Sequence, residues 1–129
     1  MNLGYACINT VLSKNKIMTN RTMRRKTFDA QGIDYVSELA LLNVKDLKTI
    51  VQWNNEMGIK LFRLSSQIFP WSDEYSIGDL QDSVEICERM LEVGKIAKDG
   101  GQRLTMHPGP YNCLASPTQK VVEKTIREL

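Results

Sequence analysis

The stretch Met57-Gly58-Ile59-Lys60-Leu61-Phe62-Arg63-Leu64-Ser65-Ser66 decides the fold of this chain. Its apolar run, Ile59 to Leu64, has the length of a buried strand, and the glycine before it can take the left-handed conformation that ends a helix. Two more runs of strand length, Leu3 to Ile8 and Arg103 to His107, are also bounded by turn residues. The sequence therefore predicts three strands.

Helical periodicity fills the intervals between these runs. In the first interval the apolar residues step by three or four, the spacing of one buried helix face that ends at Met57-Gly58. They are Ile33, Val36, Ala40, Val44, Leu47 and Val51. The second interval predicts a helix that begins after Asp79 as its N-cap and ends at Gly100-Gly101. Its expected buried stripe is Leu80, Val84, Cys87, Leu91 and Gly94. A third helix is expected from Ser116-Pro117 onward.

Strand, loop and helix thus follow one another three times, which predicts parallel strands joined by right-handed crossovers. Three parallel strands leave two open edges, and a complete TIM barrel takes about 250 residues in eight such units. We interpret residues 1–129 as one α/β domain, an incomplete TIM barrel of about three βα units with parallel strands. A small three-layer α/β domain is the alternative.

Composition excludes several classes of protein. The 129 residues are 42% hydrophobic and 25% charged, which is ordinary globular usage, and the net charge of +2 identifies no partner. No apolar run approaches a membrane span, so no membrane association is expected. The three cysteines form no C-x-x-C pair, and the first residues do not resemble a signal peptide, so an intracellular location is expected.

Polar residues collect where the three strands end, which in βα folds is the functional face. Asn9 follows the first strand, residues 63–67 the second, and residues 107–111 the third. His107, the one histidine, is either a metal ligand or a hydrogen-bonded core residue. Asp73 and Glu74 are candidates for further ligands or ordinary loop carboxylates.

Basic residues are concentrated between Ser13 and Lys26. Six of the 17 Lys and Arg residues lie there, with no acidic residue among them. Such a cluster can bind phosphate backbones, although a solvated loop or helix start would look the same. Tyr5 and Tyr111 are candidates for stacking on exposed bases, with core packing as the alternative for Tyr5.

Several segments, in order along almost the whole chain, resemble the N-terminal part of UV-damage endonucleases. They are Leu3 to Thr10, Asn20 to Arg24, Asn43 to Leu47, Trp53 to Ile59, Phe62 to Pro70, Arg103 to Gly109 with Tyr111, and Ala115 to Pro117. Single motifs such as His107-Pro108-Gly109 are weakly specific, but the ordered set is specific. The resemblance implies a TIM-barrel endonuclease, related in fold to endonuclease IV, that cleaves DNA 5′ of ultraviolet photoproducts.

The resemblance also implies roles for individual residues. His107 would ligate a divalent metal, foremost Mn²⁺, with Zn²⁺ or Mg²⁺ as alternatives, and Glu74 would occupy a position where the family usually has histidine. Pro110 replaces the family's usual glutamine and so removes a polar probe of the damaged site. No catalytic residue is assigned. The expected DNA-binding residues are Tyr5, Asn9, Arg21, Arg24, Arg25, Arg63, Gln67 and Tyr111.

The resemblance points to metal-assisted phosphodiester hydrolysis by a full-length monomer acting on double-stranded DNA that carries ultraviolet photoproducts. The family's other metal ligands lie beyond this part of the sequence, so the 129 residues alone are expected to be inactive. Three alternatives stay open: a non-catalytic DNA-binding fragment, a sugar isomerase-like TIM-barrel metalloenzyme, and a protein like the apurinic-site nuclease endonuclease IV.

Overall fold

A computed structural model describes residues 1–109 and 111–129, apart from the side chain of Glu128. Its strands are β1 (Gly4–Ala6), β2 (Leu61–Leu64) and β3 (Arg103–Met106). Its α-helices are α1 (Arg25–Glu56), α2 (Ser83–Asp99) and α3 (Gln119–Glu128). Short 3-10 helices are η1 (Leu12–Asn15), η2 (Ser72–Glu74) and η3 (Ile77–Asp79). The predicted alternation of strands and helices is therefore confirmed.

The three strands form one parallel sheet in the order β1-β2-β3. The register places Tyr5 beside Phe62, and Phe62 beside Leu104, in one row across the sheet. Because side chains alternate along a strand, Arg63 points to the opposite face from Phe62. At the start of β1 the two strands approach closely, and a Cβ on Gly4 would lie 2.5 Å from the Cβ of Leu61. Only glycine fits there.

Helix α1 supplies most of the core. It contains a kink at Gly32, whose φ of 68° and ψ of −163° suit glycine alone, so the regular helix begins at Ile33 as the stripe predicts. The predicted stripe is confirmed by burial: Val36, Ala40, Val44, Leu47 and Val51 are fully buried, and Ile33 packs against them. The helix ends at Glu56, and Gly58 follows with a φ of 71°.

Helix α2 forms, but two predictions about it were wrong. Asp82, not Asp79, precedes its first residue, because the Asp79 side chain accepts a hydrogen bond from the Ser76 amide at 3.0 Å and closes η3. Of the predicted stripe, Leu80 is buried just before the helix, but the members within α2 do not face the core: Val84 is 71% exposed and Leu91 76% exposed. The buried face carries Ile86, Val93 and Ala97.

Two ion pairs accompany the packing of α2 on α1. Glu92 accepts a 2.6 Å contact from Lys48 of α1, and Glu85 lies 3.9 Å from Lys45 of the same helix. The hydrogen bond from Lys48 lowers the pKa of the Glu92 carboxyl, which shows that its charged form is favoured. Both acidic residues therefore lie beside α1, but exposed ion pairs contribute little, and it is the burial of Ile86, Val93 and Ala97 that leaves Val84 and Leu91 outside.

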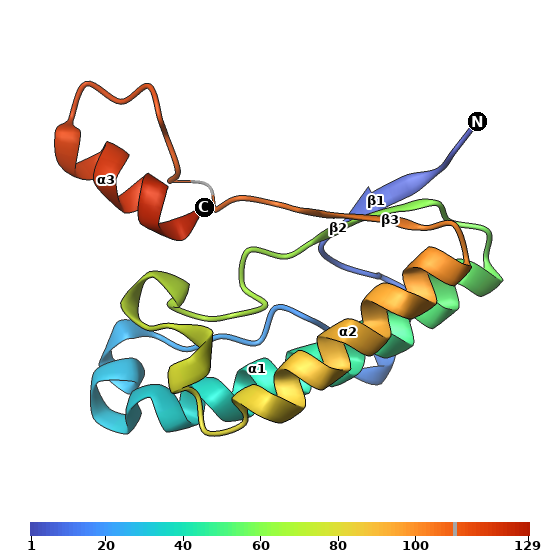
Figure 1. Cartoon of the computed structure of the whole chain (residues 1–129), viewed down its shortest axis with the longest axis horizontal. Helices are drawn as coiled ribbons and strands as arrows, with labels where there is room; N and C mark the ends of the chain where they lie inside the picture. The colour runs from blue at the N-terminus through green and yellow to red at the C-terminus, as the bar shows by residue number, and fades with distance from the viewer. Residues whose placement is uncertain (110) are drawn as a thin grey trace.

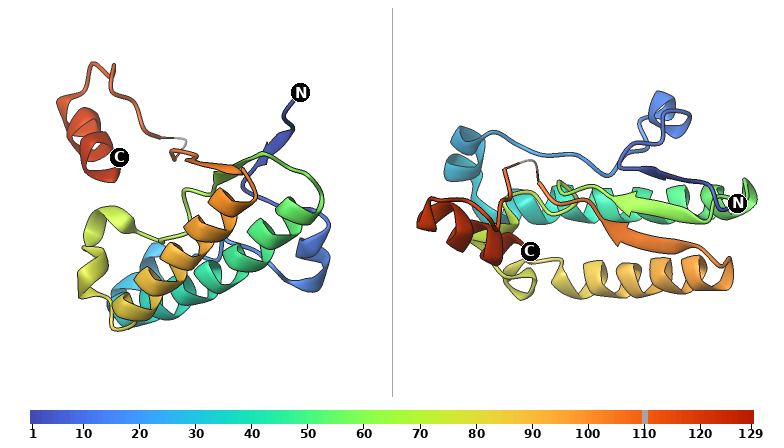
Figure 2. Two further views of the ribbon diagram at one scale, coloured as in Figure 1. Left: turned by 45° about the vertical axis from the view of Figure 1, so that its right-hand side comes forward. Right: turned by 90° about the horizontal axis from the view of Figure 1, so that it is seen from above.

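The two long helices lie side by side against one face of the sheet, as Figures 1 and 2 show. Helix α3 stands apart at one end, beyond β3, and begins at Gln119, three residues after the predicted Ser116. Within this helix Thr125 is buried and Ile126 is exposed. None of the helices in residues 1–109 and 111–129 is long and apolar enough to cross a membrane.

Candidate nucleic-acid interface

Two adjoining cavities open where β2 and β3 end. The first, of about 290 Å³, lies between the segment after η1 and the loop after β2, with Thr22, Gln67 and Asp73 in its walls. The second, of about 390 Å³, lies between the loops after β2 and β3 and is lined by His107. Four residues line both cavities: Ser66, Phe69 and Ser72 from the segment after β2, and Gly109 from the loop after β3. The cavities thus form one hollow at the carboxyl edge of the sheet.

His107 projects from the end of β3 into this hollow. Its amide donates to the carbonyl of Leu64 at 2.9 Å, which extends the β2–β3 ladder by one residue. Ring atom Nδ1 lies 2.8 Å from the carbonyl oxygen of Pro108. A carbonyl only accepts, so Nδ1 is the donor in this contact, and Nε2 is the ring nitrogen left to meet a ligand. In the same cavity the buried Nδ2 of Asn112 has no partner among the described residues.

A complete metal centre does not form in the part of the chain that the structure describes: no three His, Cys, Asp or Glu side chains gather there. The donor set is therefore insufficient for a catalytic metal, which needs at least three protein ligands. His107 contributes a single candidate ligand, one nitrogen of its imidazole ring.

The carboxylate of Glu74, predicted as a ligand, binds Arg25 of α1 at 2.9 Å and lines neither cavity. The guanidinium also lies 5.4 Å from the ring centres of both Phe28 and Trp71. Hydrogen bonding to Glu74 raises the pKa of Arg25, so this cation stays charged. Asp73, the neighbouring carboxylate, turns into the first cavity and lies 3.7 Å from Lys124 of α3.

Tyr5 and Asn9 make internal hydrogen bonds and line neither cavity. The Tyr5 hydroxyl accepts a bond from Asn9 at 2.9 Å, and its ring lies 4.9 Å from that of Phe62. Asn9 also accepts from the amides of Val11 and Leu12 at 3.1 and 2.9 Å. Burial raises the pKa of Tyr5 although its hydrogen bonds oppose the rise. Together these contacts fix the turn that follows β1.

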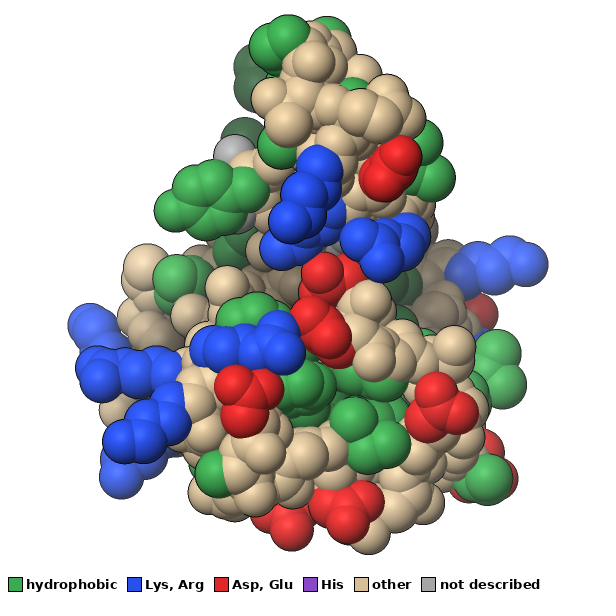
Figure 3. Space-filling model, turned by 90° about the vertical axis from the view of Figure 1, so that its left-hand side faces the viewer, with side chains coloured by type: hydrophobic (Ala, Val, Ile, Leu, Met, Phe, Trp, Pro, Cys, Tyr) green, Lys and Arg blue, Asp and Glu red, His purple; other side chains and the backbone are tan. Residues whose placement is uncertain are grey.

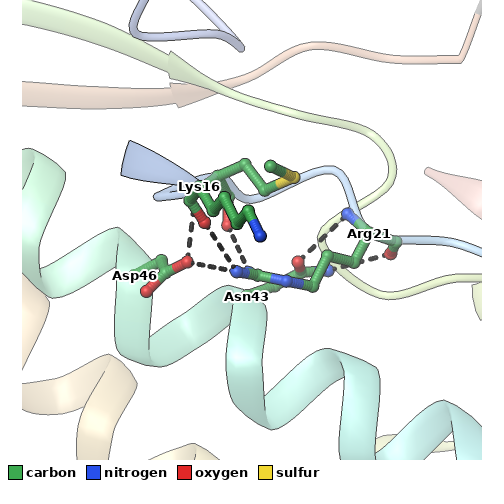
Figure 4. Close-up of polar contacts among 5 residues, drawn as sticks. Lys16, Arg21, Asn43 and Asp46 are labelled. Atoms are coloured by element: carbon green, nitrogen blue, oxygen red, sulfur yellow. Dashed lines mark hydrogen bonds and ion pairs between the residues drawn. The ribbon is translucent and has the colours of Figure 1, made fainter. Parts of the chain in front are cut away.

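In the basic segment, one arginine is held by hydrogen bonds within the chain and another is exposed to solvent. Arg21 binds Asp46 of α1 at 2.6 Å and the carbonyl oxygens of Met18 and Lys16 (Figure 4). Arg24 is exposed and immediately precedes α1. Figure 3 looks onto this end of the molecule, where basic side chains gather along one edge beside acidic ones. Only part of the cluster is therefore free to meet a phosphate backbone.

The remaining predicted DNA-binding residues occupy separate positions. Gln67 is exposed at the first cavity, and Tyr111 beside it is 90% exposed. Arg63 lies on the sheet face away from the helices, where its charge partly offsets the effect of burial that raises the pKa of Cys7. Pro110, which replaces the family's usual glutamine, lies outside the described residues. The structure thus brings Gln67, Tyr111 and His107 to one hollow and leaves Arg63 apart.

Sequence reasoning missed two buried asparagines of α1, Asn43 and Asn54, both fully buried. Asn54 links the Tyr5 hydroxyl to Gln102, and Asn43 binds two loops beside the first cavity. The signal was present, because Asn43 follows Ala40 by three positions and precedes Leu47 by four, in phase with the apolar stripe. A polar residue at a core position must find buried hydrogen-bond partners.

A parallel βα sheet with a hollow at the carboxyl ends of its strands places the chain among the α/β proteins, the class that includes TIM barrels and doubly wound folds. A model of the family described as "UV-endonuclease UvdE" matches residues 1–129. The chain belongs to this family.

Known relatives agree with the assignment. The chain is 42% identical to the UV-damage endonuclease of Schizosaccharomyces pombe over 98% of its own length and 21% of the relative. It is 41% identical to a putative UV-damage endonuclease of Acanthamoeba polyphaga mimivirus over 98% of itself and 39% of that protein. The chain therefore spans between about a fifth and two fifths of these relatives.

The fold is also that of the family. The crystal structure of SacUVDE superposes on this chain with a TM-score of 0.83 and 25% sequence identity. The match covers 99% of this chain and 42% of the SacUVDE chain. The three parallel strands with their helices are thus part of a TIM barrel, as the sequence predicted.

Proposed function

We propose that this chain provides the DNA-holding part of an endonuclease that cleaves double-stranded DNA 5′ of ultraviolet photoproducts by metal-assisted hydrolysis. One observation carries the proposal. Gln67, His107 and the highly exposed Tyr111 surround a hollow at the carboxyl edge of the sheet, with the exposed Arg24 in the basic segment. The names of the relatives, UV-damage endonucleases, supply the substrate.

The chemistry of each residue suits its proposed role. Tyr111 exposes 90% of its surface, so its ring is available to stack on an unpaired base, a contact worth roughly 1–3 kcal/mol per base. Gln67 offers both a donor and an acceptor to a base edge. Arg24 supplies charge for the phosphate backbone. Arg25 does so only in part, because Asp29 and Glu74 offset its charge.

We further propose that the complete protein uses a divalent metal, Mn²⁺ first, with His107 as one ligand. The Nε2 atom of His107, the ring nitrogen left to meet a ligand, supports this role. No three-ligand set occurs within residues 1–109 and 111–129, so these residues alone should bind DNA without cutting it.

The test uses the 129-residue chain with a fluorescently labelled, ultraviolet-irradiated duplex and Mn²⁺. We expect salt-sensitive binding, tighter for the irradiated than for the undamaged duplex, and no incision. Equal affinity for both duplexes would contradict damage recognition, and incision beside the lesion would contradict the inactivity of the isolated chain. A second, non-catalytic function as a DNA-binding protein is favoured by the missing ligand set, and binding with no metal response would support it.

A further inference from the structure

The buried carboxamide of Asn43 joins two loops that form opposite walls of the first cavity. Its Oδ1 accepts from the amide of Arg21 at 3.1 Å, and its Nδ2 donates to the carbonyl of the same residue at 3.1 Å. Nδ2 also donates to the carbonyl of Ile68 at 3.1 Å, in the loop after β2. Figure 4 shows Asn43 with Arg21 above helix α1.

The neighbouring residues of these two loops are the cavity walls. Thr22 and Met23 follow Arg21 directly, and Gln67 and Phe69 flank Ile68. Asn43 itself is fully buried and does not line the cavity. It therefore acts on the cavity only through the backbone of the walls.

Two further contacts hold the same segments. One helical turn beyond Asn43, Asp46 accepts from the amide of Met18 at 3.1 Å and from Arg21 at 2.6 Å. Across the cavity the indole N–H of Trp71 donates to the carbonyl of Met23 at 3.2 Å. The Trp71 contact joins the two walls directly, so it reports on their separation.

A buried carboxamide is suited to set a distance. Its hydrogen bonds are directional, and each backbone group that it satisfies would be left without a partner if the walls moved apart. Apolar packing tolerates small displacements more readily because it has no preferred angle. The bonds of Asn43 to Arg21 on one side and to Gln67 and Ile68 on the other thus hold the two wall segments at a set distance.

We propose that Asn43 is a positioning residue that sets the separation of the cavity walls and thereby controls how the chain holds DNA. The inference rests on the proposed function, since the walls carry Gln67 and lead into the basic segment at Arg24. Because Asn43 is fully buried, it has no surface with which to contact DNA itself. Its effect passes through the loop backbones of residues 21–23 and 66–69.

The test measures the separation of the cavity walls through Trp71 fluorescence, and it measures the affinity for DNA separately. The chain has two tryptophans, so Trp53→Phe leaves Trp71 as the sole reporter. In this background Asn43→Ala should raise the acrylamide quenching of Trp71 and shift its emission to the red. It should also weaken binding to an irradiated duplex by about tenfold and reduce the slope of log affinity against log salt by about one.

Two further variants serve as controls for this experiment. Ser37→Ala is the matched control, because Ser37 is also fully buried on α1 and binds Asp82 through two hydrogen bonds, away from both cavities. It should lower stability without changing Trp71 quenching or the salt slope. Asn43→Asp keeps the size and the acceptor but loses the donor to the carbonyls of Arg21, Gln67 and Ile68, so it should reproduce the Trp71 change if the alanine variant does not fold.

The outcomes separate this inference from the proposed function. Unchanged Trp71 quenching in folded Asn43→Ala or Asn43→Asp overturns the positioning role. A changed quenching with unchanged DNA affinity also overturns it, because wall separation would then not control binding. If the parent chain does not bind irradiated DNA, the proposed function fails, and the quenching result alone decides whether Asn43 sets the walls.

Discussion

The phenolic hydroxyl of Tyr5 donates a hydrogen bond to Oδ1 of Asn54 at 2.6 Å, and so joins β1 to α1. Asn54 in turn donates to Gln102, just before β3, at 2.9 Å. On the other side Asn9 donates to Tyr5 at 2.9 Å. A single chain of side chains therefore connects the turn after β1, the long helix and the start of β3.

Removing the Tyr5 hydroxyl should destabilise the fold. In Tyr5→Phe the buried Oδ1 of Asn54 and the buried amide of Asn9 each lose a partner, so the free energy of unfolding should fall by about 1–3 kcal/mol. Urea unfolding measures the loss. Tyr111→Phe is the control, because Tyr111 is 90% exposed and its change should stay within about 0.5 kcal/mol. Equal effects of the two variants would show that the Tyr5 network contributes nothing.

Stability should decline at alkaline pH because of Tyr5 and Tyr75. Burial raises the pKa of both hydroxyls above the ordinary value of 10.0, and the charge of Asp73 adds to the effect at Tyr75. The unfolded chain loses these protons at lower pH than the folded chain does. Their stabilising contribution is therefore complete below about pH 10 and is lost as the pH rises through the raised pKa values.

Tyr75→Phe tests the alkaline decline. Urea unfolding from about pH 8 to about pH 11 should show a flatter fall in unfolding free energy for this variant than for the parent chain. The variant also loses the hydrogen bond to the Pro70 carbonyl, so it should start from a lower stability at neutral pH. Parallel curves for the two proteins would rule out a raised pKa at Tyr75.

Arg24 and Arg21 should respond oppositely to substitution although both belong to the basic segment. Arg24 is exposed, so Arg24→Ala should lower the salt slope of DNA binding by about 0.9 with little loss of stability. Arg21 binds Asp46 and two carbonyls, so Arg21→Ala should chiefly cost stability, about 1–3 kcal/mol. Lys98→Ala, exposed on α2, is the control for general charge. A salt slope lowered as much by Lys98→Ala would refute a specific role of Arg24.

The ion pair between Arg25 and Glu74 should restrain DNA binding. Glu74→Gln removes one of the two carboxylates that pair with Arg25 and leaves Asp29, so affinity for duplex DNA measured in the presence of a chelator should rise. Stability should change by less than about 1 kcal/mol, since both side chains are well exposed. Weaker binding in the chelator would mean that Glu74 itself contacts the DNA. A Mn²⁺ titration of the same variant tests separately whether Glu74 is a ligand.

Much of the fold could be predicted from the sequence because its strands and its longest helix carry unambiguous patterns. The strand runs are short and bounded by turns, and the stripe of α1 from Val36 to Val51 has one apolar face. Parallel pairing followed from the alternation of elements alone. His107 at the end of β3 followed from the same reasoning, since strand ends define the hollow.

The details of the candidate site were less accessible to prediction. Asp73 and Glu74 are adjacent in sequence, yet one enters the cavity and the other binds Arg25, and only the path of η2 decides between them. The bond between Arg21 and Asp46 joins residues 25 positions apart, which no local pattern encodes. The positions of tertiary partners thus set which cations remain free.

The orientation of α2 provides the last prediction, because the sequence offers two apolar faces. Val84 and Leu91 form one, and Ile86, Val93 and Ala97 form the other. The second face is buried, and Met90 and Ile96 extend it against the core. Ile86→Ala should therefore lower the unfolding free energy by about 3 kcal/mol. Leu91→Ala should stay within about 0.5 kcal/mol, since Leu91 is 76% exposed. Urea unfolding compares the two, and a larger loss at Leu91 would mean that α2 buries its other face in solution.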